Sequence, residues 1–305
     1  MSDTAGRAAS DALARVLLDA RARRVAFLGL AKNVGKTTAL VATLASLHRR
    51  GILAAATSAG RDGEAFDAIT GEPKPRFRIS RGQLLASAAE TFETASFPSA
   101  EIATLDLTTR FGPILLRRAD GDGEIEVIGP GTVSQLAKAA GALEAAGAEI
   151  VLLDGAIGRR AFASGRLADG IVLAAGLAAG DSLDAVRAAV RGALELIRLG
   201  PPPPGAEVRE VDGALTDASL REKPPRRGET VVARDFTAIF LSAGRRRALA
   251  EEGVSLAVRE PARLLAVTVN PTAPARPPVP AERLFGAIQE LARPAPVFDL
   301  VAGLH

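Results

Sequence analysis

Several residue types are absent or scarce in this chain of 305 residues. It has no cysteine, tryptophan or tyrosine, and its only histidines are His48 and His305. The lack of cysteine excludes disulfides and zinc sites with cysteine ligands, and two histidines are too few for a histidine-rich metal site. Without tryptophan and tyrosine the chain also lacks the best stacking platforms for unpaired bases.

The charge balance does not favour a nucleic-acid partner either. The sequence pI is about 9.8, but the formal net charge is only +3. Almost no group in the chain titrates between about pH 7 and about pH 10, so a small positive charge persists to high pH. We therefore expect no nucleic-acid binding.

Long apolar runs are missing as well. The first 24 residues mix Asp and Arg without the apolar core of a secretory signal. No run of about 18 apolar residues, the length of a membrane-spanning helix, occurs. These features predict a cytoplasmic protein without a membrane partner. The apolar content of 48% is enough for a large core.

Short apolar runs alternate with segments of helical periodicity. This alternation predicts an α/β fold with a doubly wound, mostly parallel sheet and flanking helices. We expect an N-terminal helix within 1–23, then a single domain over 24–305 with a proline-rich insertion at about 200–231. The expected strands are 24–28, 52–57, 114–117, 125–128, 149–153, 170–174, 237–241 and 264–268. The expected later helices are 39–50, 133–146, 182–199, 243–251 and 281–291.

The stretch VAFLGLAKNVGKTTALV (25–41) reads as a strand, a loop and a helix. A helix that starts after such a loop directs free backbone amides at one point, where they can bind phosphate. The pattern predicts that Lys36 reaches the β and γ phosphates of a nucleotide, that Thr37 ligates Mg²⁺ and that Thr38 contacts the α phosphate. The alternative is a chance GKT in a loop. The predicted nucleotide-binding residues here are Asn33, Val34, Gly35, Lys36, Thr37 and Thr38.

Two carboxylates are candidates for a magnesium or catalytic role beside Lys36. Asp154 ends the apolar run Ile150–Leu153, so it should face the crevice at the carboxyl ends of the strands. Asp62 follows the second expected strand and could hold Mg²⁺ or orient water, with Glu64 a weaker candidate. The alternatives are a helix N-cap for Asp154 and an Asp-Gly turn for Asp62.

Other polar segments allow a ligand role or a purely structural one. Asn270 follows an expected strand and could read a purine edge, or it could form an Asn-Pro turn. The sequence Gly129-Pro-Gly-Thr132 could face a ligand, or Thr132 or Ser134 could cap a helix. The basic residues could contact phosphate or a partner, or be solvated; they are Arg61, Lys74, Arg76, Arg81, Arg159 and Arg160.

The spacing Gly29-x₅-Gly35-Lys36-Thr37 resembles the P-loop of dethiobiotin synthetase and its relatives. More broadly, five stretches in their order resemble the P-loop subunit of the lysine 5,6-aminomutase reactivase family. They are GLAKNVGKTTAL, TSAGRDGE with DAITGEPKPR, IEVIGPGTVSQ, LLDGAIGRRAFAS and VTVNP.

This resemblance implies an ATPase that uses Mg²⁺, with Lys36, Asp62 and Asp154 as catalytic residues. Thr37, Asp154 and Asp62 would be the metal ligands. It further implies a reactivating chaperone that drives exchange of damaged cobalamin. Its partners would be an adenosylcobalamin-dependent aminomutase and a second, MutS-like ATPase subunit.

Two other functions remain open from the sequence. One is a dethiobiotin-synthetase-like ligase or kinase that uses ATP, and the other is a nucleotide-sensing module with little turnover. The absence of an N-K-x-D motif favours ATP over GTP in each case.

Overall fold

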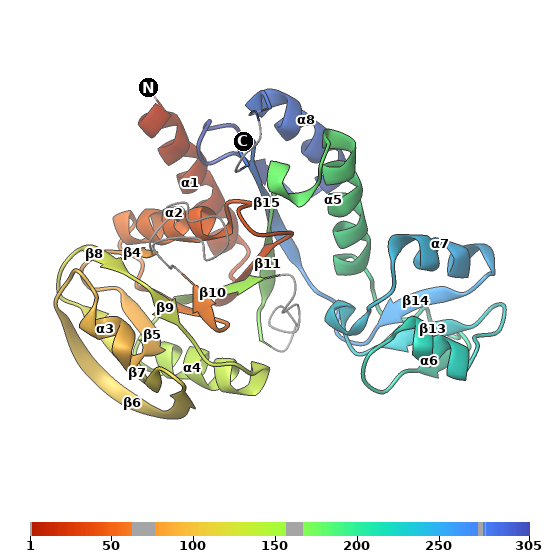
Figure 1. Cartoon of the computed structure of the whole chain (residues 1–305), viewed down its shortest axis with the longest axis horizontal. Coiled ribbons are helices and arrows are strands. Elements are labelled where there is room, and N and C mark those ends of the chain that lie inside the picture. The colour runs from red at the N-terminus through yellow and green to blue at the C-terminus, as the bar shows by residue number, and fades with distance from the viewer. Residues whose placement is uncertain (1, 63–76, 157–166, 274–276, 278) are drawn as a thin grey trace.

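The computed structural model describes residues 2–62, 77–156, 167–273, 277 and 279–305. Its largest element is a nine-stranded sheet with helices on both faces, and a separate three-stranded sheet lies at one side (Figure 1). The predicted α/β fold with a mostly parallel, helix-flanked sheet is confirmed.

The main sheet has the strand order β16-β15-β11-β1-β10-β2-β5-β7-β6. The strands from β16 through β5 are parallel, whereas β7 is antiparallel to both β5 and β6. The bounds are β1 Arg24–Gly29, β2 Ala54–Ser58, β5 Leu84–Ala88, β6 Ser99–Thr109, β7 Gly112–Ala119, β10 Ile150–Ala156, β11 Gly170–Gly176, β15 Leu264–Asn270 and β16 Val297–Phe298.

Alternation along β1 shows how the two faces are covered. Val25 and Phe27 belong to a buried cluster with residues of α1 (Ser2–Asp19) and α2 (Lys36–Arg49). Ala26 and Leu28 belong to a second cluster, to which the other three flanking helices contribute. These helices are α4 (Val133–Ala145), α5 (Leu183–Ile197) and α8 (Ala281–Ala292). The core is therefore two apolar layers separated by the sheet.

The N-terminal helix α1 is held against α2 by hydrogen bonds. Asp11 of α1 accepts hydrogen bonds from Ser46 and Arg49 of α2, at 2.5 and 2.6 Å. On another side, α1 meets the C-terminal segment, because a Cβ on Gly6 would lie 2.4 Å from the carbonyl oxygen of Leu300. The two ends of the chain thus pack together.

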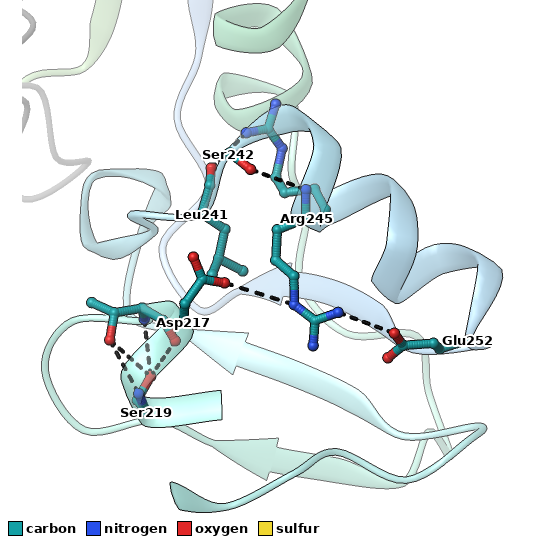
Figure 2. Close-up of polar contacts among 8 residues, drawn as sticks. Asp217, Ser219, Leu241, Ser242, Arg245 and Glu252 are labelled. Carbon is teal, nitrogen blue, oxygen red and sulfur yellow. Dashed lines mark hydrogen bonds and ion pairs between the residues drawn. The ribbon is translucent and has the colours of Figure 1, made fainter. Parts of the chain in front are cut away.

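The small sheet forms a lobe of its own, together with α6 (Asp217–Glu222) and α7 (Ala243–Glu251). Its strands β12 (Val208–Glu210), β13 (Thr230–Ala233) and β14 (Ser255–Val258) are parallel in that order. Arg245 joins α7 to α6 through an ion pair with Asp217 at 3.7 Å, and it also pairs with Glu252 at the end of its own helix at 3.0 Å (Figure 2).

The small lobe is attached to the main sheet through α5. Arg246 of α7 donates to the carbonyl oxygen of Gly192 at 3.0 Å and to the carboxylate of Glu195 at 2.9 Å, and both partners lie on α5. The chain leaves the carboxyl end of β11, runs back along α5, passes through the lobe and then begins β15. The lobe is therefore inserted at the amino edge of the main sheet. The proline-rich 200–231 segment is part of this lobe.

One predicted strand is wrong, and another is divided into two short strands. The predicted strand 237–241 falls on a short 3₁₀ helix, η3 (Phe236–Ala238), because Asp235 accepts from the backbone N–H of Thr237 at 2.9 Å and caps it. The predicted strand 125–128 is split into β8 (Gly123–Ile125) and β9 (Val127–Ile128). These pair antiparallel with β4 (Phe77–Ile79) and β3 (Arg61–Asp62), outside the main sheet.

Two short helices complete the description, α3 (Ala89–Glu93) and η2 (Leu177–Ala179). In the described part of the chain, no helix combines the length and apolar character needed to cross a membrane.

Candidate functional site

The loop between β1 and α2, Leu30–Gly35, lies at the carboxyl edge of the sheet. Two residues turn the chain there with positive φ, Asn33 at 60° and Gly35 at 84°. Gly35 is the N-cap residue of α2 and offers no side chain to cap the first amides of the helix. The strand therefore meets a helix N-terminus whose leading N–H groups can bind an anion.

Strand order places this loop where the chain changes direction across the sheet. β1 lies between β10 and β11, and the chain passes from β10 on one side of β1 to β11 on the other. Such a switch in open α/β sheets leaves a crevice outside the carboxyl ends of the strands, where ligands bind.

Lys36 and Asp154 meet in this region. Asp154 lies in β10, opposite Phe27 of β1 and Ser58 of β2, and is only 1% exposed. The ammonium nitrogen of Lys36, the first residue of α2, lies 2.5 Å from Oδ1 of Asp154. The sequence named both residues, and the fold brings them into contact. The alternative of a helix N-cap at Asp154 is wrong, since the residue lies inside a strand.

Thr37 and Thr38 follow in the first turn of α2 and are half-buried. The described residues include no group of three or more His, Cys, Asp or Glu side chains that could hold a metal by themselves. Mg²⁺ usually keeps several waters and takes one or two carboxylates together with substrate phosphates. A threonine hydroxyl and the Asp154 carboxylate supply hard oxygen ligands of that kind, so the residues present fit Mg²⁺ shared with a phosphate.

Asn270, at the end of β15, contacts the β1–α2 loop. Its side-chain Nδ2 donates to the backbone carbonyl of Asn33 at 3.2 Å, and its Oδ1 accepts from the hydroxyl of Thr272 at 2.8 Å. A Cβ added to Gly35 would lie 3.2 Å from the Cβ of Asn270. Asn270 therefore belongs to the site, but its amide is bonded to the loop and to its own turn.

Gly176 was missed by the sequence reasoning. It ends β11, and a Cβ there would lie 3.1 Å from the Cα of Val34 and 3.0 Å from the carbonyl oxygen of Asn270. A side chain at this position would have to displace the loop or the end of β15 by a few tenths of an ångström, so glycine favours the close approach. No sequence signal marked it, because the contact depends on strand order.

The backbone brings Asp62 toward the same edge. The N–H of Ala59 donates to the carbonyl oxygen of Asp154 at 2.8 Å, and Asp62 pairs with Val127 in the short β3–β9 ladder. The side chain of Asp62 lies outside the described part, so its magnesium or water-orienting role stays a prediction.

The Gly129–Thr132 segment packs on the end of β2. Gly129 donates from its N–H to the carbonyl oxygen of Gly60 at 2.8 Å, and a Cβ at Gly129 would lie 1.6 Å from the carbonyl oxygen of Ser58. Thr132 caps α4 by accepting from the N–H of Gln135. Helix capping, one of the two interpretations of this segment, is therefore confirmed for Thr132.

The basic residues are less informative. Arg81 precedes β5, so it lies toward the amino edge of the sheet, away from Lys36. The side chain of Arg61, and the whole of Glu64, Lys74, Arg76, Arg159 and Arg160, fall outside the described residues.

Comparison with known proteins gives no relative. No family model, curated protein or solved structure matches this chain.

Proposed function

We propose that this chain binds ATP with Mg²⁺ at the carboxyl edge of the sheet, in a P-loop formed by Gly29–Thr37, and hydrolyses it slowly. The contact between Lys36 and Asp154 carries the proposal. A cation that can pair with phosphate and a carboxylate that can pair with a metal lie together at the N-terminus of α2, whose N-cap residue Gly35 has no side chain. A purely structural ion pair elsewhere in the sheet would not lie beside a helix N-terminus.

Lys36 and Asp154 neutralise one another within a mostly buried setting. When the phosphates arrive, the ammonium of Lys36 turns to their oxygens, and the α2 amides donate to the same chain of phosphates. The carboxylate of Asp154 would then be available to hold the metal ion. Val34, Gly35 and Thr38 contribute through the loop and helix backbone or a hydroxyl.

Thr37 and Asp154 would hold Mg²⁺, with Asp62 as a further ligand or as the group that orients the attacking water. Bound Mg²⁺ would neutralise charge that develops on the phosphate oxygens. Asp62 would accept a hydrogen bond from water and align it with the terminal phosphate. Hydrolysis of a P-loop nucleotide depends on such positioning more than on covalent chemistry.

The narrower proposal rests on the resemblance to the lysine 5,6-aminomutase reactivase family. The chain would then be the ATPase subunit of a chaperone that exchanges damaged cobalamin in an adenosylcobalamin-dependent aminomutase. A MutS-like ATPase would be its second partner. In that setting, the partners would stimulate a slow basal turnover.

The test is phosphate release from Mg-ATP by the wild type, Lys36→Met and Asp154→Asn. Lys138→Met, which alters an exposed lysine of α4, is the matched control. We expect turnover in the wild type and the control, and a loss of at least about 100-fold in the two site variants, as for removal of a group that stabilises transition-state charge. Equal rates in all four proteins would refute the proposal.

Adding an inactivated adenosylcobalamin aminomutase, with and without the MutS-like subunit, then tests the narrower part. Stimulated turnover and recovery of aminomutase activity, both lost in Lys36→Met, are expected for a reactivase. Turnover that instead requires a small metabolite would favour the ligase or kinase alternative.

A further inference from the structure

The side chain of Asn270 connects two parts of the site that are far apart in the sequence. It projects from the end of β15, while the backbone atom it contacts, the carbonyl oxygen of Asn33, belongs to the β1–α2 loop. Between them lies Gly176 at the end of β11. The three neighbouring strands β1, β11 and β15 thus meet at this point.

Hydrogen bonds from Thr272, two residues further along the chain, fix the orientation of the Asn270 side-chain amide. Oδ1 accepts from the backbone N–H of Thr272 at 3.2 Å and from the Thr272 hydroxyl at 2.8 Å. These two bonds use both lone pairs of the amide oxygen and leave Nδ2 to face the loop. A purine edge that needs both a donor and an acceptor would find the acceptor already occupied.

The bond to Asn33 acts on the turn of the loop. Asn33 has a φ of 60°, in the left-handed region that asparagine adopts more readily than most other non-glycine residues. The peptide unit is planar and trans, so the N–H of Val34 points away from the carbonyl of Asn33. Fixing that carbonyl toward Asn270 therefore also fixes the direction of the Val34 N–H.

Gly35 adds a steric contact to this polar one. Its positive φ and the 3.2 Å approach of a Cβ there to the Cβ of Asn270 show that the loop backbone lies directly against the asparagine. Asn270 thus lies against the loop at both Asn33 and Gly35, just before α2 begins.

We propose that Asn270 is a positioning residue of the triphosphate site, and that it holds residues 33–35 in the conformation that aims their amides at phosphate. The inference rests on the proposed function, and it differs from a role in reading the base. Its consequence is that Asn270 contributes to the affinity for the polyphosphate whatever base is attached.

The experiment is a calorimetric titration of Mg-ATP, Mg-GTP and Mg-tripolyphosphate into the wild type, Asn270→Leu and Asn270→Ala. Tripolyphosphate carries no base, so it separates the two roles. Because one net hydrogen bond and its loop ordering are lost, we expect all three ligands to weaken by a similar factor, about threefold to tenfold. Thr272→Val, which removes only the hydroxyl bond to Oδ1, should weaken them in parallel by less.

Thermal unfolding of each ligand-free variant shows whether it is folded. If Asn270→Leu does not fold, Asn270→Ala replaces it in the titration. A loss confined to Mg-ATP, with tripolyphosphate unchanged, would overturn the inference in favour of a base contact. Unchanged affinity for all three ligands would overturn it as well. Both results leave the proposed function standing, whereas a wild type that binds none of the ligands would refute the proposed function itself.

Discussion

The ammonium of Lys36 lies 2.5 Å from the Oδ1 of Asp154, a carboxylate in the middle of the main sheet with no exposed side-chain surface. One residue opens α2 and the other ends the apolar run of β10. In a buried setting each charge depends on the other for compensation. If a phosphate recruits Lys36, Asp154 loses its contact with the ammonium, so the proposed function predicts that triphosphate binding is coupled to Mg²⁺ binding.

The first prediction concerns the stability of the nucleotide-free protein. Lys36→Met leaves Asp154 buried without its lysine, and Asp154→Asn leaves Lys36 without its carboxylate. We expect each single change to lower the free energy of unfolding by about 3 kcal/mol, the size typical of a broken buried pair. Urea denaturation measures this change.

The double variant is the matched control for that prediction. With both charges removed, no uncompensated buried ion remains, so its stability should lie closer to the wild type than that of either single variant. Additive losses in the double variant would show that the two charges do not compensate one another.

The second prediction concerns Gly129, which packs on the end of β2. A Cβ there would lie 1.6 Å from the carbonyl oxygen of Ser58, and backbone cannot yield as a flexible side chain can. Gly129→Ala should therefore lower the free energy of unfolding by about 2 kcal/mol or more, as overpacking does. Gly131→Ala, where a Cβ meets no atom within 4 Å, should change it by less than about 0.5 kcal/mol. Similar stability of the two variants would contradict the close packing.

The elements that the sequence predicted well are those with local signals. The strand 24–28 and the helix beginning in GKTT show the periodicity and the glycine turn within one short window. By contrast, β6 and β7 form a hairpin that joins the sheet through the antiparallel pairing of β7 with β5, and that pairing joins segments about 30 residues apart in the sequence. The segment 237–241 is apolar enough for a strand, but the cap from Asp235 turns its first residues into a 3₁₀ helix.

The third prediction tests how the small lobe is attached. Arg246 donates to the carbonyl oxygens of Leu241 and Gly192 and to Glu195, and its side chain is only 11% exposed. Arg246→Met keeps much of the volume but removes these bonds, so we expect a loss of about 1 to 3 kcal/mol. Arg247→Met, at the exposed next position, should have little effect. Mass spectrometry of limited digests should show faster cleavage between α5 and the lobe in Arg246→Met than in the wild type, and no such increase in Arg247→Met.

The fourth prediction is a pH dependence. The hydrogen bond from Arg24 lowers the pKa of Glu144 below its ordinary value of 4.5. A depressed pKa means that the carboxylate stabilises the fold at pH values above 4.5, and that this contribution is lost as the pH falls through the folded-state pKa. The wild type should therefore be more stable than Glu144→Gln near neutral pH, and the difference should shrink below about pH 4. A difference that stays constant across this range would contradict the prediction.

The residues of the candidate site that could be predicted are those marked by their local sequence context. Lys36, Thr37 and Asp154 were named from local context, and the parallel sheet brings Lys36 and Asp154 together. The positions of Gly176 and Asn270 around the loop could not be read from the sequence, because they depend on β11 and β15 lying next to β1 in the strand order. The Asn-Pro signal marked a turn after β15 but not the loop that the asparagine contacts.

The measurement that tests the central claim most directly is equilibrium binding of radiolabelled ATP, with and without Mg²⁺, to the wild type and to Lys36→Met. The account predicts one saturable, magnesium-dependent site in the wild type and an affinity at least about tenfold weaker in the folded variant, because a charge-assisted contact to phosphate is lost. If the wild type shows no saturable binding, or if both proteins bind ATP equally well, the loop at Lys36 is not a triphosphate site.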